Sequence, residues 1–98
     1  MTYELEFHPD ALKEWKNLDE SVRRPLKKKL EARLEEPRNP KAALHGMPDC
    51  YKLKHGSYRL VYRVFDTTIV IMVMAVGKRE RLAAYDAASN RIGDDSSQ

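Results

Sequence analysis

The dipeptide Gly56-Ser57 constrains the fold of this chain more than any other feature of its sequence. It separates two segments, Tyr51–His55 and Tyr58–Phe65, in which apolar residues alternate with polar or charged ones, the pattern of half-buried strands. A two-residue loop with glycine first is typical of a type II′ hairpin turn. The two segments are therefore predicted to pair as antiparallel strands, and the short loop sets which residues lie opposite one another.

This register sorts the side chains of the hairpin onto two faces. The apolar face carries two pairs, Tyr51 opposite Tyr62 and Leu53 opposite Leu60. On the other face Lys54 lies opposite Arg59, and Lys52 lies beside them. Like charges directly opposed across two strands destabilise a sheet, and such conflicts tend to mark functional sites. For any one of these cations a simpler interpretation stays open, since long side chains on a solvent face can splay apart at little cost.

Hydrophobic periodicity predicts further elements on both sides of the hairpin. A short strand is expected over Tyr3–Phe7, then a helix with Pro9 in its first turn, then a second helix with the apolar stripe Val22, Leu26, Leu30 and Leu34. Thr68–Val76 is rich in β-branched residues and is predicted to be a strand. A last helix carries the stripe Leu82, Tyr85, Ala88 and Ile92.

The resulting element order is βααβββα, which predicts an α+β domain. A small, mainly antiparallel sheet is expected to pack against an N-terminal helical hairpin and to be followed by the C-terminal helix. The three C-terminal strands should form a meander, whereas periodicity leaves the position of the first strand open. One domain is expected over residues 1–92, with a flexible polar tail over residues 93–98.

The start of the second helix depends on the position of Pro25. With Ser21 as the capping residue, Pro25 falls at the end of the first turn, where a missing amide hydrogen costs little. With Asp19 as the cap, Pro25 would remove an internal hydrogen bond and kink the helix. We therefore expect Ser21 to be the cap.

The composition indicates a soluble protein of the cytoplasm. A single cysteine, Cys50, excludes an internal disulfide and a multi-cysteine zinc site, and suits a reducing compartment. The sequence shows neither a signal peptide nor an apolar run of the roughly 20 residues that a membrane span needs. A pI near 9.1 points to a polyanionic partner, with nucleic acid as the first candidate and an acidic protein segment as the second.

The positive charge is concentrated between Lys52 and Arg81. This stretch holds seven Lys or Arg residues against two acids, whereas residues 1–51 balance ten bases with ten acids and residues 82–98 are net negative. Such a distribution indicates a localised anion site rather than a generally basic surface. A cationic face without carboxylates suits a phosphate backbone, and arginine can hold phosphate oxygens bidentately.

Other candidates lie near the ends of the predicted strands. Lys78, Arg79 and Arg81 precede the last helix, where cations are unusual because a helix N-terminus favours anions. Tyr85 follows about one turn later and would serve base stacking, supply a hydroxyl, or simply pack in the core. His55, at the hairpin turn, is a candidate general base or RNA contact, although an exposed turn residue is the simpler interpretation.

The remaining polar residues argue against metal chemistry. Carboxylate pairs and metal-ligand clusters are absent from the basic segment, which makes a two-metal nuclease unlikely in sequence terms, and no cofactor or metal is expected. The run Lys27–Lys29 is followed by three glutamates within two turns and is interpreted as a solvated helix face. Arg63 is likewise interpreted as a solvated strand residue.

Several of these stretches resemble the RelE toxins of bacterial toxin–antitoxin pairs. The resemblance rests on Ala11–Trp15, Gly46–Lys52, Tyr58–Tyr62 and Val76–Arg81, four motifs in the same order and at close spacing. It covers about residues 2–92. Two departures are a hairpin that is shorter between Lys54 and Tyr58, and the extension after Ile92. The shorter hairpin could alter ribosome contacts or codon preference.

The resemblance implies an endoribonuclease that enters the ribosomal A site, cleaves the mRNA codon there and is neutralised by a RelB-like antitoxin. It implies contacts with rRNA, and with operator DNA indirectly through the antitoxin complex. Family positions for catalysis fall on Lys52, Lys54, Arg59, Arg79 and Tyr85. Lys78, Arg81 and His55 are expected to bind RNA or the ribosome.

On this hypothesis the mRNA 2′-hydroxyl attacks the adjacent phosphate and gives a cyclic phosphate and a free 5′-hydroxyl. Lysine is a poor base at neutral pH unless neighbouring cations disfavour its charged form, so Lys52 or Lys54 could act as base. Arg59 and Arg79 would stabilise the transition state, and Tyr85 or Arg79 would orient the base or assist the leaving oxygen. Weak activity on free RNA is expected.

Two alternatives share the fold without cleaving RNA. One is a gyrase poison like the ParE proteins of the same superfamily, which need not keep the Lys, Arg and Tyr set. The other is a non-catalytic nucleic-acid-binding co-repressor that acts only with its antitoxin.

Overall fold

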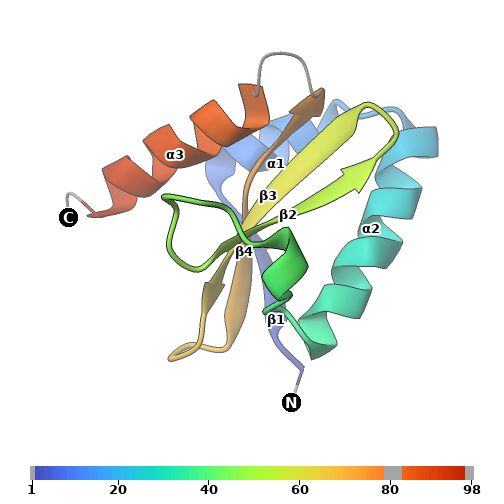
Figure 1. Ribbon diagram of the computed structural model, residues 1–98. Helices are drawn as coiled ribbons and strands as arrows, with labels where there is room; N and C mark the ends of the chain where they lie inside the picture. The colour runs from blue at the N-terminus through green and yellow to red at the C-terminus, as the bar shows by residue number, and fades with distance from the viewer. Residues whose placement is uncertain (1, 79–82, 97–98) are drawn as a thin grey trace.

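The hairpin around Gly56-Ser57 forms one edge of a four-stranded sheet (Figure 1). The computed structural model describes residues 2–78 and 83–96. Its strands are β1 (Glu4–Phe7), β2 (Cys50–His55), β3 (Tyr58–Phe65) and β4 (Val70–Lys78). They lie in the order β1-β4-β3-β2, with β1 parallel to β4 and the other pairs antiparallel. The predicted meander is confirmed, and the first strand, whose position the sequence left open, lies beside β4.

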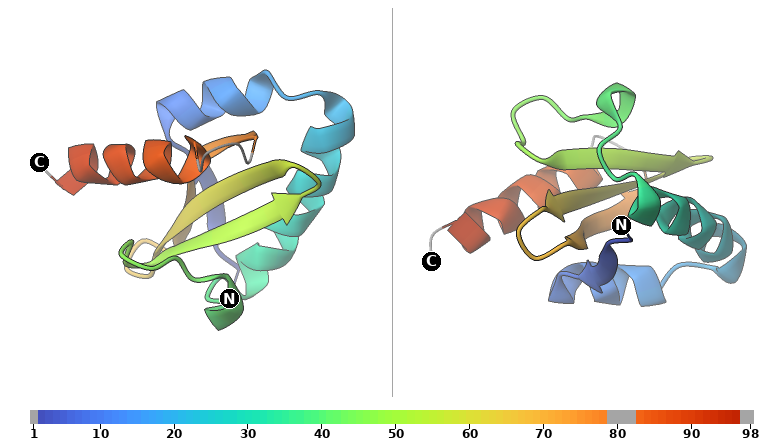
Figure 2. Two further views of the ribbon diagram at one scale, coloured as in Figure 1. Left: turned by 45° about the horizontal axis from the view of Figure 1, so that its top comes forward. Right: turned by 90° about the horizontal axis from the view of Figure 1, so that it is seen from below.

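Over the described residues, three α-helices and a short 3-10 helix complete the fold. They are α1 (Pro9–Lys16), α2 (Glu20–Glu35), the 3-10 helix η1 (Pro40–Ala42) and α3 (Ala83–Ser96). The predicted βααβββα order and α+β class are confirmed. In two views α3 lies on the opposite side of the sheet from α2 (Figures 1 and 2). Within the described residues no helix is long and apolar enough to cross a membrane.

The predicted register of the hairpin is confirmed. The pairs run from Cys50 opposite Arg63 to His55 opposite Tyr58, and Lys54 lies opposite Arg59. Gly56 has a φ of +57°, the left-handed conformation that a type II′ turn requires at its first position and that glycine adopts without steric cost.

The predicted start of the strand at Thr68 is wrong by two residues. Residues 66–69 form a turn, and Ile69 adopts a φ of +57°, which is incompatible with extended backbone. The β-branched side chains favour a strand at Thr68 and Ile69, but the chain has to reverse there for β4 to pair with β3. The strand therefore begins at Val70 and continues to Lys78.

The expected cap of the second helix is also wrong. Asp19 is the N-cap, because its carboxylate accepts hydrogen bonds from the Ser21 backbone N–H (3.1 Å) and from the Ser21 hydroxyl. Pro25 consequently lies inside α2, where it cannot donate to the Ser21 carbonyl. The charge-assisted cap that Asp19 provides at the helix N-terminus offsets the loss of this hydrogen bond. The prediction considered only the cost of the internal proline and not the stabilisation by the cap.

Two apolar clusters fill the two faces of the sheet. The cluster under α1 and α2 contains the predicted inward residues, among them Leu26, Leu30, Leu53, Leu60 and Tyr62. The cluster under α3 contains Cys50, Val61, Met74, Ala75 and Ala88. A bulge opposite the step from Val61 to Tyr62 leaves Met74 without a partner in the register, and Met74 and Ala75 both join the α3 cluster.

The C-terminal helix differs from expectation at its end. It runs to Ser96 and so includes part of the segment predicted to be a polar tail, whose flexibility stays a prediction. Ala88 is buried on the predicted stripe, and Tyr85 and Ile92 pack beside it. Leu82, predicted on the same stripe, lies outside the described residues.

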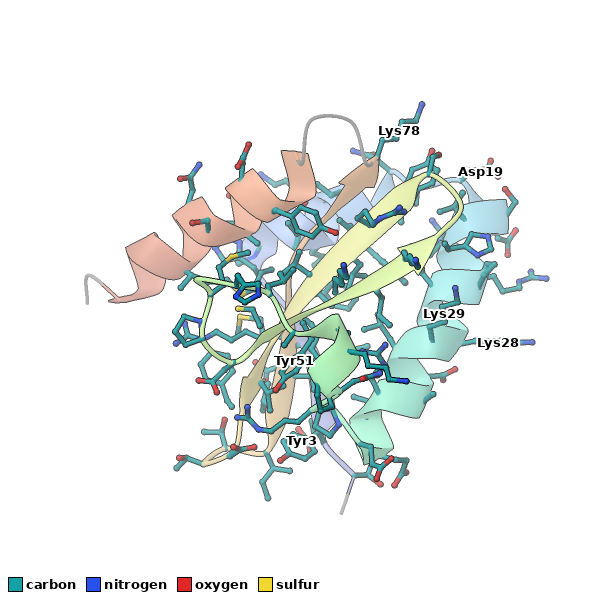
Figure 3. All side chains as sticks on the ribbon, in the orientation of Figure 1. Tyr3, Asp19, Lys28, Lys29, Tyr51 and Lys78 are labelled. Carbon is teal, nitrogen blue, oxygen red and sulfur yellow. The ribbon has the colours of Figure 1, made fainter. Side chains whose placement is uncertain are left out.

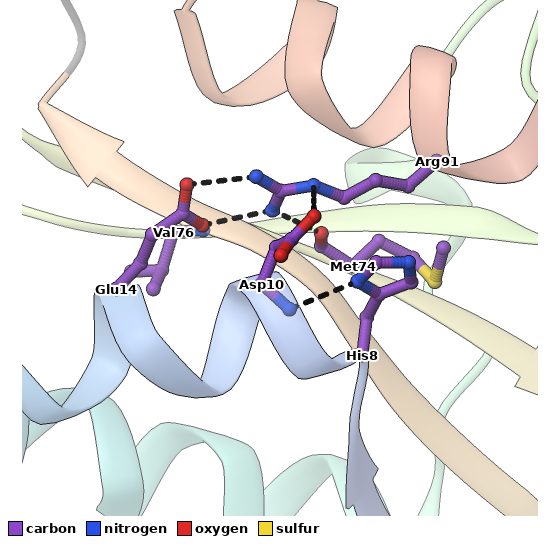
Figure 4. A network of polar contacts seen from close by, with 6 residues as sticks. All are labelled: His8, Asp10, Glu14, Met74, Val76 and Arg91. Atoms are coloured by element: carbon purple, nitrogen blue, oxygen red, sulfur yellow. Dashed lines mark hydrogen bonds and ion pairs between the residues drawn. The ribbon is translucent and has the colours of Figure 1, made fainter.

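A polar network fastens α3 to α1 (Figure 4). Arg91 of α3 donates to both carboxylate oxygens of Glu14 (2.9 and 3.0 Å) and to the Met74 carbonyl (2.8 Å). Glu14 in turn accepts a hydrogen bond from the Val76 N–H (3.2 Å). Strand β1 pairs with β4 only as far as Val73, so these two side chains satisfy the backbone of β4 where its neighbour has ended.

A second network joins the end of α2 to the turn before β4. Arg38 pairs with Asp66 (2.7 Å) and Asp49 (3.0 Å), and the Tyr3 hydroxyl donates to Asp66 (2.7 Å). Hydrogen bonds from Arg38 and then from Tyr3 lower the pKa of the Asp66 carboxyl below its ordinary value. Its contribution to stability is therefore present above the ordinary carboxyl pKa and is lost as the pH falls through the lower, folded-state pKa.

We expect the stability of the Asp66→Asn variant to depend less on pH in the acid range than the stability of the wild type does. The variant should lose stability at neutral pH and converge with the wild type as the pH falls through the lowered, folded-state pKa of Asp66, where the native carboxyl becomes protonated as well. The measurement is the melting temperature from pH 2 to 7, with Asp86→Asn on the exposed face of α3 as a charge-matched control. A constant difference between Asp66→Asn and wild type at every pH would contradict the expectation.

Candidate functional site

One row of residues crosses three strands on the α3 side of the sheet. Lys54 of β2 lies opposite Arg59 of β3, which lies opposite Gly77 of β4. Side chains at such directly opposed positions are separated by only about 4.5–5.5 Å at Cβ. Among the described residues, a Cβ built on Gly77 would meet nothing within 4 Å, so within this part of the chain the row ends in open space beside Arg59. The predicted cationic pair is thus present, and none of the described residues fills the space next to it.

Arg59 is held in place by the hairpin turn. Its Nη1 donates to the carbonyls of Gly56 (2.9 Å) and Tyr58 (2.8 Å). A guanidinium has five N–H donors, so these bonds orient the group while other donors stay free for an anion. The tight turn therefore fixes the register of the hairpin and also orients the Arg59 guanidinium.

Lys52 lies one step further along the same face. It is half-buried and opposite Val61, which belongs to the α3 cluster. Tyr85 packs against this cluster and remains partly exposed. The core-packing interpretation of Tyr85 is confirmed, and the helix brings it to the same face of the sheet as Lys52 and Arg59. A chemical role for its hydroxyl stays a prediction.

The charge of this row is not neutralised by the described part of the protein. The ion pairs over residues 2–78 and 83–96 involve Arg24, Arg38 and Arg91, and none of them reaches Lys52, Lys54 or Arg59. Uncompensated cations side by side repel one another, and this repulsion is relieved when an anion binds. The arrangement therefore favours a phosphate-bearing ligand.

The structure does not show the remaining predicted site residues as part of the row of Lys54, Arg59 and Gly77. Lys78 extends from the end of β4, and strand alternation turns it to the side opposite Gly77 (Figure 3). His55 is half-buried at the end of β2, opposite Tyr58. Arg79 and Arg81 lie outside the described residues. The functional roles of all four stay predictions.

The interpretation of the run Lys27–Lys29 as a solvated helix face is confirmed, because all three residues are exposed. Lys29 also donates its Nζ to the Lys54 carbonyl (2.5 Å), whereas Lys28 points away from the domain (Figure 3). The interpretation of Arg63 as a solvated strand residue is wrong in part, because the residue is half-buried, its guanidinium lies over the ring of Phe65 at 5.0 Å, and its Nε is buried.

The side chains of Lys29, Arg33 and Lys41 belong to a groove that the sequence interpretation missed. They line it together with Lys52 and Lys54. One signal was available, because Lys29 and Arg33 are four residues apart and so share the side of α2 next to its apolar stripe. Lys41 has no comparable signal, since it lies in η1.

Nucleophilic and metal-binding alternatives have little support in the described residues. Burial raises the pKa of the Cys50 thiol to about 11, so this thiol is protonated at neutral pH. Across residues 2–78 and 83–96 there is no group of three or more His, Cys, Asp or Glu side chains that could hold a metal ion.

Comparison with known proteins agrees with this geometry. Residues 5–83 match the family model described as the ParE toxin of type II toxin–antitoxin systems. The chain is 53% identical to the mRNA interferase toxin RelE of Escherichia coli K12 over 94% of this chain and 99% of the relative. It is 46% identical, over the same shares, to a putative RelE-like toxin protein of E. coli.

Solved structures give the same result. A double arginine mutant of the E. coli RelE toxin in the free state superposes with a TM-score of 0.87 at 51% identity, covering 94% of this chain and 99% of that one. RelE in the intact E. coli RelBE toxin–antitoxin complex has a TM-score of 0.77 at 54% identity, covering 81% and 99%. Sequence and fold agree over nearly the whole chain, which therefore belongs to the RelE family of type II toxins.

Proposed function

We propose that this protein is an endoribonuclease toxin that cleaves mRNA in the ribosomal A site and halts translation in the cytoplasm. The observation that carries the proposal is the row of Lys54 and Arg59 with Lys52 beside it, cationic, fixed by the hairpin and without a carboxylate partner in the described residues. The name of the 53% identical relative, mRNA interferase toxin RelE, supports the same activity.

The proposed reaction is a transesterification within the RNA. The 2′-oxygen bonds to the adjacent phosphorus while the bond from phosphorus to the 5′-oxygen breaks, which leaves a 2′,3′-cyclic phosphate and a free 5′-hydroxyl. Lys52 or Lys54 takes the proton of the 2′-hydroxyl, and the leaving 5′-oxygen receives a proton from Tyr85 or from a water molecule held by Tyr85 or Arg79. Arg59 and Arg79 stabilise the negative charge that develops on the phosphoryl oxygens.

No step of this reaction requires a metal ion, because arginine and lysine supply the positive charge. Lysine, arginine and tyrosine are, as residue types, poor acid–base groups at neutral pH, and among the described residues nothing closes the site on the Gly77 side. We therefore propose that the ribosome positions the mRNA and supplies most of the entropic advantage that the toxin alone cannot provide. His55, Lys78 and Arg81 would contact RNA around the scissile phosphate.

The proposed partners are an antitoxin, the small ribosomal subunit with its rRNA, and mRNA. A solved relative is RelE bound in the intact RelBE toxin–antitoxin complex, and another is a RelE mutant bound to a peptide of the antitoxin RelB. We propose that a RelB-like antitoxin neutralises this protein too, and that the pair reaches operator DNA through the antitoxin.

A second candidate function is gyrase poisoning, favoured by the match of residues 5–83 to a ParE toxin model. A gyrase poison has no need of Lys52, Lys54 and Arg59 as an unpaired set. The presence of all three on one face therefore supports the nuclease, and so does the 53% identity to a protein named mRNA interferase toxin RelE. A non-catalytic co-repressor would also use a phosphate-binding face, so the cleavage assay is what separates it from the nuclease.

Primer extension on mRNA in a translating extract tests the proposal. The wild type should produce breaks at codon-spaced A-site positions, and these should vanish with Lys54→Ala and with Arg79→Ala. Terminal-group analysis of the fragments should show a cyclic phosphate and a 5′-hydroxyl. Equal breaks in the variants, or no breaks together with inhibited gyrase supercoiling, would refute the nuclease.

Gly77 offers a test in which folding and activity separate. Valine at this position would direct a branched side chain into the open space beside Arg59 without contacting another group of the described structure. We expect Gly77→Val to unfold at the same urea concentration as the wild type or a higher one, since valine favours strands, but to cleave at least tenfold more slowly. Unchanged cleavage by a folded Gly77→Val protein would mean that RNA does not occupy this space.

A further inference from the structure

A cationic groove of about 460 Å³ follows the free edge of β2. It is lined by residues of β2, of the last turns of α2, and of η1 together with the residue before it. Its polar lining consists of five cations and one amide: Lys29, Arg33, Lys41, Lys52, Lys54 and Asn39. We call this feature the β2-edge groove.

Two of these cations are held in place by the fold. Arg33 donates to the Tyr62 hydroxyl (2.8 Å), which itself donates to the Pro37 carbonyl (2.6 Å). Lys29 donates to the Lys54 carbonyl on the outer edge of β2. Each of these contacts uses one donor, so the guanidinium and the ammonium keep further N–H groups for a ligand. The groove is therefore a partly preorganised anion site rather than a set of freely moving lysines.

None of the described residues that line the β2-edge groove is acidic. The glutamates at the C-terminal end of α2, Glu35 and Glu36, line a different depression on the far side of Arg33. Five cations around one space without a carboxylate require a ligand that carries several negative charges in a row. A single inorganic phosphate would satisfy only part of this set, whereas a nucleic acid strand presents one charge per nucleotide.

The groove is continuous with the row described above. Lys52 and Lys54 line the groove, and Lys54 is also the cross-strand neighbour of Arg59. A strand whose phosphate lies beside Arg59 can therefore place a neighbouring phosphate between Lys29, Arg33 and Lys41. We therefore expect the substrate RNA strand to occupy the groove, because this strand already passes Lys54 in the proposed reaction.

We propose that the β2-edge groove binds the phosphate backbone of the mRNA strand next to the cleaved phosphate, with Lys29, Arg33 and Lys41 as binding residues. The inference rests on the proposed function for the identity of the strand. In this arrangement the toxin holds single-stranded RNA over more than one nucleotide, and the extra contacts align the scissile phosphate with Arg59.

The test uses a short single-stranded RNA with 2′-O-methyl riboses, which cannot be cleaved because the attacking hydroxyl is blocked. Binding is measured by fluorescence anisotropy at several salt concentrations for wild type, Lys29→Gln, Lys41→Gln and the double variant. Lys28→Gln is the matched control, since Lys28 is adjacent in sequence but points away from the groove (Figure 3). Lys41→Gln guards against a folding defect, because Lys41 contributes its backbone N–H to the Asn39 turn and that bond is retained.

We expect the double variant to bind at least tenfold more weakly than Lys28→Gln. The slope of log K against log salt should fall in magnitude by about 0.7 for each phosphate contact removed. Lys41→Gln alone should show part of both effects with an unchanged melting temperature. Binding and slopes that match Lys28→Gln would overturn the proposal.

Ribosomal RNA is the alternative occupant, and ribosomes separate it from mRNA. Affinity for ribosomes without mRNA should be the same for the double variant and the Lys28→Gln control, whereas affinity for ribosomes with an A-site codon should fall for the double variant alone. A loss on vacant ribosomes together with unchanged oligonucleotide binding would overturn the assignment to mRNA. If wild-type toxin cleaves at A-site codons but the groove variants bind RNA normally, only this inference fails and the proposed function stands.

Discussion

Arg59→Ala is expected to lower the rate of A-site cleavage by about 10²–10³-fold, the loss typical of removing one preorganised donor from a developing oxyanion. The guanidinium is already oriented by the Gly56 and Tyr58 carbonyls, so the wild type has little reorganisation left to perform when the transition state forms. The measurement is single-turnover cleavage on programmed ribosomes with toxin in excess. Under these conditions a slower rate reports chemistry rather than weak binding.

Lys54→Ala should lower the rate of A-site cleavage by a similar factor. Lys54→Arg then shows whether Lys54 acts as a base or through its positive charge. Arginine retains the positive charge but does not give up a proton at any pH reached in these assays. If Lys54 is the base, arginine should fail to restore activity, and if Lys54 acts by charge alone, arginine should restore much of it. The same pair of substitutions at Lys52 completes the comparison.

Arg24→Ala serves as the control for these kinetic variants. Arg24 is exposed and forms an i,i+4 pair with Glu20 on the surface of α2, so its loss should leave the cleavage rate within about twofold. Rates within tenfold of wild type for both Arg59→Ala and Lys54→Ala would contradict the proposed site. A loss with Arg24→Ala as large as with Arg59→Ala would point to a general dependence on net charge.

Glu14→Ala is expected to lower the free energy of unfolding by about 2–3 kcal/mol, because it leaves the Arg91 guanidinium without its bidentate carboxylate. The Arg91 side chain is only 14% exposed, so water cannot fully replace Glu14. The Val76 N–H loses its acceptor at the same time. Urea unfolding gives the size of the effect.

The expected effect is local as well as global. Since Glu14 and Arg91 join α1 to α3, amide hydrogen exchange in α3 should accelerate more than exchange in β3. Glu20→Ala is the control, because it breaks an exposed pair and should cost less than about 1 kcal/mol. An equal cost for the two substitutions, or unchanged exchange in α3, would show that this network does not hold the helix.

The hairpin and its cations were predictable because the information is local. A two-residue turn and alternation on both sides leave one register, and this register places Lys54 opposite Arg59 wherever the hairpin lies in the protein. The helix stripes were predictable for the same reason, since Leu26 and Leu30 are buried as their spacing requires. Local rules failed where two of them competed, at the Asp19 cap against the internal Pro25 and at the turn through Ile69.

The sequence by itself therefore determined the element order, the register of β2 with β3 and the grouping of Lys52, Lys54 and Arg59, because each depends on residues a few positions apart. Only the tertiary structure decided which cations share a groove and how α3 is held. Lys29 and Arg33 face Lys52 and Lys54 because α2 packs against the edge of β2, and Arg91 meets Glu14 across most of the chain. Hydrophobic periodicity in the sequence does not predict such contacts, because they arise when complete helices and strands pack against one sheet.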